Sequence, residues 1–257
     1  YDDEGVRSLK EKTKRRVHPF GYNEDADIYA DYHETLFENG KPAGITFKVL
    51  FEGNVAPIRI EGVLGRQFMY PVLAGISVGM AEGLNIVEIT DALAHLATSP
   101  GRMRIIAGKR GATIIDDTYN ASPIAVAEAL HVLEGFKDVA RRIAVLGTMA
   151  ELGKHSVEAH TTAGKEVAQS ADMLITVGMQ ARAMADSARE AGLRDVASFD
   201  TAQEASHYLS NLIHEGDIIL IKGSQSVRLE KAVEELMDNP LQKDELLVRQ
   251  GKAWEDR

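Results

Sequence analysis

The chain has 257 residues and a formal net charge of −10, from 39 acidic and 29 basic side chains. Its 44% hydrophobic content excludes a largely disordered chain, and its acidic balance argues against a general nucleic-acid binder, which needs lysine and arginine on phosphates. The lack of cysteine excludes disulfides, zinc–thiolate sites and thiol nucleophiles, and no apolar run approaches the ~20 residues that span a bilayer.

We therefore expect a soluble, cytoplasmic protein that binds neither nucleic acid nor membrane. The first residue is Tyr1, and the charged opening segment is typical of the interior of a loop rather than of a signal peptide. We expect the chain to be a piece of a longer protein.

The first hundred residues begin with a predicted hairpin. Ile45–Phe51 and Pro57–Leu64 alternate apolar and polar side chains, which is typical of half-buried strands. The segment 52–54, Glu-Gly-Asn, separates them and predicts a tight turn between antiparallel strands.

Two helices are predicted to follow the hairpin. Small apolar residues at helical spacing predict the first over Tyr70–Ala81. The second, over Ile86–Ala97, starts with Asn85 as N-cap and Glu88 three residues later, an approximate capping box. The breaker cluster at 98–101, Thr-Ser-Pro-Gly, then predicts a domain boundary.

After this boundary, apolar β-branched runs alternate with amphipathic segments. The predicted strands cover residues 112–116, 142–146, 173–177, 196–199 and 217–221. The predicted helices cover residues 124–133, 157–169, 181–191, 202–213 and 227–237. This alternation predicts a doubly wound α/β domain, with a parallel sheet covered by helices on both faces.

The loop Asp116–Pro123 is the strongest candidate site, because ligands of open parallel sheets bind beyond the carboxyl ends of the strands. Its side chains would in part cap the following helix, for which Pro123 is well suited at the first turn. The loop nevertheless holds more polar-capable residues than a cap requires, and we interpret it as functional.

Two basic residues lie in other candidate loops. Lys222, in the loop 222–226, is predicted beside the free amides of a helix N-terminus, which favours a carboxylate or phosphate. A capped turn with an exposed lysine remains the alternative there. Arg102, at the predicted domain junction, can fork onto phosphate oxygens, although a single arginine is more often a surface charge.

The segment Gly147–His155 superficially resembles a phosphate-binding P-loop. The motif requires four residues between its glycines and a serine or threonine after the lysine, whereas this segment has five residues and His155. We therefore reject a P-loop and keep Glu151 as a candidate ligand contact. His155 and His160 are five residues apart and do not share a helix face, so no metal pair is predicted.

Taken together, these segments resemble the Mur ligases. The resemblance rests on four motifs, Pro-Gly-Arg-Met at 100–103, Ile-Asp-Asp-Thr-Tyr-Asn-Ala-Ser-Pro at 115–123, Ala-Val-Leu-Gly-Thr-Met-Ala-Glu-Leu-Gly at 144–153 and Ile-Lys-Gly-Ser-Gln-Ser-Val-Arg-Leu-Glu-Lys at 221–231. The second motif is most like the branch of the family that adds D-alanyl-D-alanine.

The resemblance implies a division into domains. Residues 1–99 would be the end of a mixed α/β central ATPase domain that lacks its P-loop. Residues 100–238 would be a Rossmann-like C-terminal domain, and residues 239–257 a tail or closing helix.

The resemblance also implies an activity. The family uses ATP and Mg²⁺ to form an acyl phosphate, which an amine then attacks, and this branch joins D-Ala-D-Ala to a UDP-N-acetylmuramoyl tripeptide in peptidoglycan synthesis. We expect a monomer with these small-molecule substrates as its partners. One alternative, within the family, is a ligase for another amino acid. The other, from a different class, is a non-catalytic module that binds a small anion or a partner.

Residue roles follow from the same resemblance. Arg102 would contact the ATP phosphates, and Asp116 or Asp117 would hold the ribose or order the loop. The residues expected to bind D-Ala-D-Ala are Tyr119, Asn120 and Ser122, together with Lys222 and Ser224 on its carboxylate. No residue of this chain is assigned a catalytic or metal-binding role.

Two departures from the family pattern bear on nucleotide binding. A metal-holding histidine of the family is Gln67 here, and an adenine-facing asparagine is Pro71. Gln is a poor substitute for an imidazole ligand, and proline offers no side-chain hydrogen bond. The family's Gly-Lys-Thr loop and its carbamylated lysine are expected upstream, so we expect these 257 residues to be inactive alone.

Overall fold

The computed structural model describes residues 1–94, 96 and 98–255. The chain divides into two compact units, residues 1–97 and 98–257. Each unit has a hydrophobic core of its own, one around the strands and helices of residues 20–94 and one around the larger sheet that follows.

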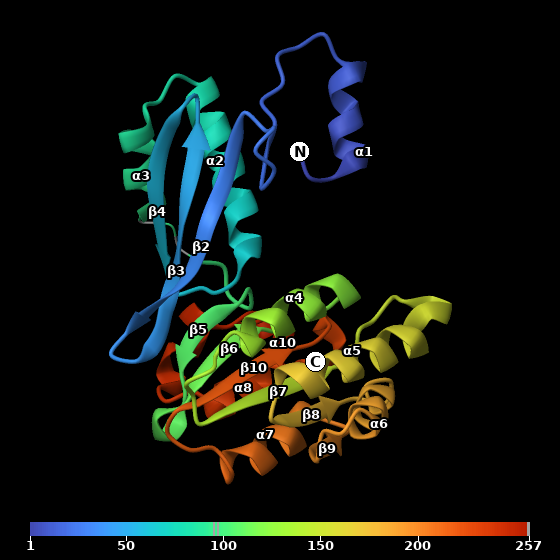
Figure 1. Cartoon of the computed structure of the whole chain (residues 1–257). Helices are drawn as coiled ribbons and strands as arrows, with labels where there is room; N and C mark the ends of the chain where they lie inside the picture. Colours follow the sequence, from blue (N-terminus) through green and yellow to red (C-terminus); the bar gives the residue numbers. More distant parts are fainter. Residues whose placement is uncertain (95, 97, 256–257) are drawn as a thin grey trace. The chain divides into compact units, whose positions relative to one another are not determined.

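The first unit is a four-stranded sheet in the order β1-β2-β3-β4 with helices on one face (Figure 1). Its strands are β1 (Phe20–Gly21), β2 (Ile28–Glu38), β3 (Lys41–Phe51) and β4 (Asn54–Glu61). Its α-helices are α1 (Glu4–Arg7), α2 (Met69–Ala81) and α3 (Ile86–Ala94). Strands β2, β3 and β4 are antiparallel, whereas β1 pairs with β2 in parallel.

The predicted hairpin and the helix predicted over 70–81 are confirmed, and one long strand was missed. The helix predicted over Ile86–Ala97 is present as far as Ala94, and residues 95 and 97 lie outside the described residues. In β4 the apolar side chains Ala56, Ile58 and Ile60 are buried against α2 and α3, because alternate residues of a strand face the same side. Helix α3 begins with the predicted capping box, in which Asn85 accepts from the Glu88 amide and Glu88 accepts from the Asn85 amide. The missed strand is β2.

The second unit is a six-stranded sheet in the order β5-β6-β10-β7-β8-β9. Its strands are β5 (Arg104–Ala107), β6 (Thr113–Asp117), β7 (Arg141–Gly147), β8 (Met173–Val177), β9 (Asp195–Phe199) and β10 (Asp217–Lys222). All neighbours are parallel except β5, which pairs antiparallel with β6 and which the sequence did not predict. Every residue of β6, β8 and β10 is buried, as expected of a parallel sheet covered on both sides.

Helices cover both faces of this sheet, which confirms the doubly wound α/β fold (Figure 1). One face carries α4 (Pro123–Glu134), α5 (Ser156–Ser170) and α6 (Arg182–Glu190), and the other carries α7 (Ala202–Ser210) and α8 (Glu230–Leu236). Alternate strand residues such as Ile143, Ile175 and Ile219 pack with α7 and α8 in a single apolar cluster. The carboxyl ends of the parallel strands are therefore fixed by a rigid core.

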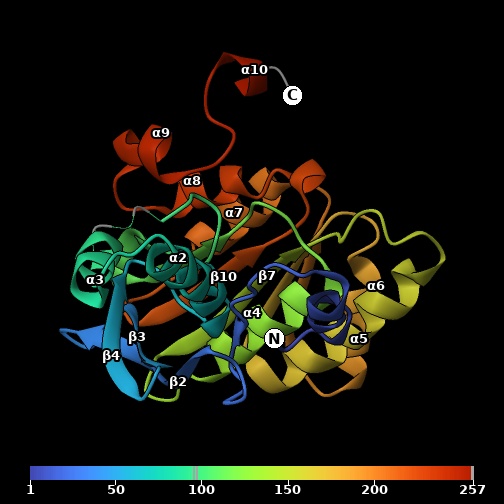
Figure 2. The same ribbon diagram turned by 90° about the horizontal axis from the view of Figure 1, so that it is seen from above.

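Residues 239–255, predicted as a tail or closing helix, include two short helices, α9 (Lys243–Leu246) and α10 (Lys252–Glu255). Figure 2 shows this red segment continuing from α8 through α9 to α10. Leu247 is buried in the apolar cluster of the sheet, and Arg104 of β5 donates to the Glu245 carbonyl at 3.1 Å. The segment is thus attached to its unit by packing and by hydrogen bonds.

In the described part of the chain, no helix is both long enough and apolar enough to cross a membrane.

Candidate functional site

The loops after β6 and β10 start side by side at the carboxyl edge of the sheet. The strand register pairs Ile221 with Asp116 and Lys222 with Asp117, so both loops leave the sheet at the same level. The Lys222 ammonium donates to Asp117 Oδ2 at 2.6 Å and to the Asn120 carbonyl at 2.9 Å. The two loops therefore lie next to each other, and direct bonds join them.

Asp116 organises the first loop from inside. Its carboxylate is fully buried and accepts from the Gly101 amide at 3.1 Å and from both the amide and the hydroxyl of Thr118, at 3.2 and 2.6 Å. Burial raises the pKa of Asp116 to about 6, while the hydrogen bonds from Thr118 and Gly101 oppose that shift and the neighbouring Asp117 adds to it. Of the two roles predicted for Asp116, contact to a ribose or ordering of the loop, this geometry favours the second, because the carboxylate is buried and bonded within the loop.

Asp117 and Lys222 form a buried ion pair. The Lys222 side chain is only 3% exposed, and Asp117 also accepts from the Met103 amide at 3.2 Å. Both charges are matched inside the fold, so neither is presented to a ligand. The predicted roles of Lys222 as a carboxylate anchor and of Asp117 as a ribose contact are not supported by this geometry; the pair joins the two loops instead.

A pocket of about 620 Å³ opens between these loops and the loop after β7. It is lined by Asn120, Ala121, Ser122, Ala150, Glu151, Leu152, Ser224, Gln225, Ser226, Arg228 and Trp254. We call it the loop pocket. Of the predicted dipeptide residues, Asn120, Ser122 and Ser224 line it, and so does the candidate contact Glu151.

Ser224 and Ser122 have structural partners at the edge of the loop pocket. Ser224 is buried, and its hydroxyl accepts from the Ala150 amide at 2.8 Å while donating to the Ala121 carbonyl at 3.4 Å. Ser122 is the N-cap of α4 and accepts from the Ala125 amide at 3.4 Å. Ser224 therefore joins all three loops that surround the pocket, while Ser122 starts the helix beside it.

A second pocket, of about 530 Å³, holds Arg102 and Tyr119. It is lined by Ser99, Pro100, Arg102, Tyr119, Gln225, Val248, Arg249 and Trp254, and we call it the arginine pocket. The Arg102 guanidinium lies 4.0 Å from the centre of the Tyr119 ring, a distance suited to a cation–π contact, and the ring is 48% exposed. Tyr119 thus lies apart from Asn120 and Ser122, so the predicted dipeptide set divides between two pockets.

The sequence interpretation missed four residues that line these pockets, Gln225, Arg228, Arg249 and Trp254. Gln225 and Trp254 line both. Residues 225 and 228 belong to the fourth motif and follow a buried strand, so the sequence could have indicated them as candidate ligand contacts. Residues 249 and 254 lie in the predicted tail, where no local pattern indicates a site.

A third hollow, of about 700 Å³, lies at the carboxyl ends of β7, β8 and β9. It is lined by Thr148, Ala150, Glu151, Gly178, Met179, Gln180, Asp200, Thr201, Ala202, Gln203, Ser226, Val227, Arg228 and Lys231. Glu151 and Arg228 are shared with the loop pocket, so the two hollows adjoin.

Metal ligands are sparse in the described part of the chain, where no group of three His, Asp or Glu side chains could hold an ion. Buried His160 accepts from the Met149 amide at Nε2, 3.0 Å away, and its Nδ1 lies 2.7 Å from the Ser156 carbonyl, so both ring nitrogens have backbone partners. The buried Gln67 Oε1 has no hydrogen-bond partner, but a single amide oxygen does not make a Mg²⁺ site. The described residues therefore form no site with three such ligands of their own, and the Mg²⁺ implied by the resemblance for the longer protein stays a prediction.

Comparison with known proteins decides the family. The family described as "Mur ligase, glutamate ligase domain" matches residues 101–225. The UDP-N-acetylmuramoyl-tripeptide–D-alanyl-D-alanine ligase of Escherichia coli is 32% identical over 179 residues, which cover 68% of this chain and 38% of that protein. A crystal structure of MurF from Acinetobacter baumannii has 26% identity and a TM-score of 0.78, over 93% of this chain and 51% of the solved one. Residues 101–225 belong to the Mur ligase family.

Other Mur ligases extend the comparison. The D-alanyl-D-alanine ligase of Bacillus subtilis is 27% identical over 70% of this chain and 40% of that protein. A MurF structure from Thermotoga maritima, in complex with ADP, has the same fold, with a TM-score of 0.76 over 91% of this chain. The chain spans about 40% of the length of these sequence relatives and about half of the solved chains.

Proposed function

We propose that this chain is the C-terminal half of an ATP-dependent ligase that joins D-Ala-D-Ala to a UDP-N-acetylmuramoyl tripeptide in peptidoglycan synthesis. The observation that carries the proposal is the loop Thr118–Ser122, which contributes side chains to two adjoining pockets of different chemistry. The relatives that bear this activity by name cover most of the chain. The whole activity belongs to the longer protein, and this chain supplies two of its binding surfaces.

The loop pocket suits a zwitterionic dipeptide. Glu151 offers an anion for the ammonium group. Arg228, at the same wall, shares the single Glu230 carboxylate with Arg249, so this group of three side chains keeps a net positive charge for the dipeptide carboxylate. The side chains of Asn120 and Ser226 add polar groups that fix orientation. These assignments replace Lys222 as the source of positive charge, because Lys222 is neutralised by Asp117 inside the fold.

The arginine pocket suits a nucleotide. The rings of Tyr119 and Trp254 offer flat apolar faces to a base, and Arg102 offers its guanidinium to phosphate oxygens. In the proposed reaction, ATP converts the tripeptide carboxylate to an acyl phosphate with loss of ADP, and the dipeptide amine displaces phosphate. The residues of this chain bind and orient the reactants, and no step is assigned to Mg²⁺, which stays a prediction together with the monomeric state and the cytoplasmic location.

The proposal is tested by calorimetric titration of the 257-residue chain with D-Ala-D-Ala and with ATP in separate experiments. L-Ala-L-Ala, which has the same charges and the opposite stereochemistry, is the ligand control. We expect binding of the D,D-dipeptide to weaken at least threefold in Glu151→Gln, and ATP binding to weaken in Arg102→Ala with the dipeptide response retained. The control variant Asn211→Ala, at an exposed position after α7, should change neither.

Three outcomes would contradict the proposal. An ATP response with no dipeptide response would favour a non-catalytic anion-binding module. Equal binding of the L,L- and D,D-dipeptides would favour a less selective relative. Turnover of the tripeptide substrate by this chain alone would contradict the expected need for an upstream P-loop.

A further inference from the structure

The C-terminal segment Leu247–Trp254 lies directly on the loop that separates the two pockets. Leu247 is buried in the core and anchors one end. A Cβ added to Gly101 would lie 2.9 Å from both the Tyr119 amide nitrogen and Val248 Cγ1, so the Gly101 backbone lies close to the Tyr119 backbone and to the Val248 side chain. Gly101 also has a φ of +68°, where a side chain would be strained. We call residues 247–254 the strap.

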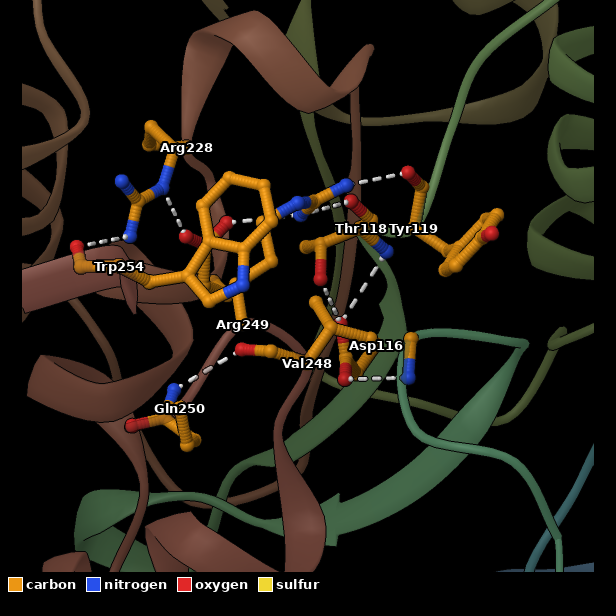
Figure 3. Close-up of polar contacts among 10 residues, drawn as sticks. Asp116, Thr118, Tyr119, Arg228, Val248, Arg249, Gln250 and Trp254 are labelled. Atoms are coloured by element: carbon orange, nitrogen blue, oxygen red, sulfur yellow. Dashed lines mark hydrogen bonds and ion pairs between the residues drawn. The ribbon is translucent and has the colours of Figure 1, made fainter. Parts of the chain in front are cut away.

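Arg249 connects the strap to the loop (Figure 3). Its guanidinium donates from Nη1 to the Thr118 carbonyl at 3.0 Å and from Nη2 to the Tyr119 carbonyl. The side chain is 6% exposed. Two successive carbonyls of the loop thus accept from one rigid fork, a geometry that a flexible single-point cation does not reproduce.

The Arg249 guanidinium also binds helix α8, through Glu230. Arg249 Nη1 also donates to Glu230 Oε2 at 3.0 Å, and Arg228 pairs with the other oxygen of the same carboxylate. Glu230 is 1% exposed. Each oxygen of the buried Glu230 carboxylate thus has its own guanidinium partner, and the bond to Oε2 fixes Arg249 from the side opposite the loop.

The backbone at Arg249 has an unfavourable conformation. Its φ of +58° is in the left-handed region, which is unfavourable for a residue with a side chain. The bonds to the loop and to Glu230 hold the residue in this state. A strained residue whose side chain supports a pocket wall, rather than filling a core, indicates a functional constraint.

We propose that Arg249 is a positioning residue: the strap fixes the carbonyls of Thr118 and Tyr119, and so holds the Tyr119 ring and the Asn120 side chain toward their pockets. Trp254, at the far end of the strap, lines both pockets and is placed by the same attachment, because Arg228 donates to its carbonyl at 3.3 Å. The ordering of the loop does not depend on the identity of the ligands. The effect of this ordering on the binding of ATP and D-Ala-D-Ala rests on the proposed function.

The test compares Arg249→Ala and Arg249→Lys with the control Arg104→Ala. Arg104 also holds the C-terminal segment, through a bond to the Glu245 carbonyl, which lies outside the loop 118–122. The first readout is amide hydrogen exchange over residues 118–121, where the Tyr119 amide donates to the Gly101 carbonyl and the Ala121 amide to Asn120 Oδ1. The second is the fluorescence of Trp254, the one tryptophan in the sequence, during titration with ATP or D-Ala-D-Ala.

In Arg249→Ala we expect exchange at residues 118–121 to rise at least tenfold while the amides of β7 and β8 keep their wild-type rates. Binding of whichever ligand the wild-type chain binds should weaken at least fivefold. Arg249→Lys should give intermediate values for both, and Arg104→Ala should match the wild type. Arg249→Lys retains the charge opposite Glu230, so it also decides the matter if the alanine variant does not fold.

Two results would overturn the inference. One is wild-type exchange at residues 118–121 in both Arg249 variants. The other is an equal rise in Arg104→Ala, which would make general loosening of the segment the cause. If the wild-type chain binds neither ATP nor the dipeptide, the proposed function fails, while the exchange measurement still decides the role of Arg249.

Discussion

Removal of the Lys222 charge should be among the most destabilising single changes in the second unit. In Lys222→Met the side-chain length is kept, but Asp117 loses its 2.6 Å partner and keeps the Met103 amide at 3.2 Å. The Asn120 carbonyl loses its donor as well. Breaking a buried ion pair from one side costs about 3–5 kcal/mol, because the remaining charge is left in the interior.

The companion variant separates the charge from the packing. In the double variant Asp117→Asn/Lys222→Met, the uncompensated charge is gone and the amide oxygen can still accept from Met103. We expect this pair of changes to recover about half of the loss, so the two single effects are not additive. The exposed pair Arg182–Asp200, with side chains 58% and 68% exposed, is the control, and Arg182→Met should cost no more than about 0.5 kcal/mol.

The assay is equilibrium unfolding in urea, followed by the fluorescence of Trp254, which reports on the second unit. With a slope of about 2 kcal/mol per molar urea, the expected loss lowers the midpoint by about 1.5–2.5 M. A loss in Lys222→Met as small as that of Arg182→Met would refute the reasoning. So would strict additivity in the double variant.

Three further predictions concern other parts of the chain. Burial raises the pKa of Asp116 to about 6 from 3.8, so the protonated carboxyl stabilises the fold below about pH 4, and this contribution is lost as the pH rises through 6. In urea unfolding, the wild type should lose up to about 3 kcal/mol of stability relative to Asp116→Asn between pH 4 and 7. A stability difference between the two proteins that does not change with pH would count against this prediction. Gly164→Ala places a Cβ 2.2 Å from the Met184 carbonyl oxygen and should lower the melting temperature, whereas Gly75→Ala, at an exposed position of α2 with open space around it, should not. Thr201→Ala removes the capping box of α7 and should cost about 1 kcal/mol in urea unfolding, with no loss disproving a role for the cap.

The sequence pattern was sufficient for the second unit because its central strands are short, continuous apolar runs. Strand β8 was placed at its observed bounds and β10 within one residue, since burial on both faces removes any alternation that could be misassigned. Strand β5 was missed because four residues at the sheet edge are too few for a period to show. Strand β2 was missed because register shifts after Asp31 and Leu36 break the two-residue repeat.

The location of the candidate site could be predicted from the sequence, but which of its charged side chains pair with each other could not. Motif and strand order placed Asp117 and Lys222 at one edge of the sheet, yet local sequence carries no sign that the two residues, 105 positions apart, neutralise each other. The same holds for Arg249, whose partners Thr118 and Glu230 lie in other elements. Such pairings are tertiary, and propensity and periodicity describe only neighbours along the chain.

The place of β10 in the sheet has a consequence for biosynthesis. This strand is the last of the six along the chain, yet it is inserted between β6 and β7. As the polypeptide leaves the ribosome, β6 and β7 each keep one edge of unpaired backbone N–H and C=O groups until residues 217–222 of β10 emerge. A nascent chain stalled before that point has no completed sheet to fold into, so chaperone occupancy during translation should peak between the emergence of β7 and that of β10.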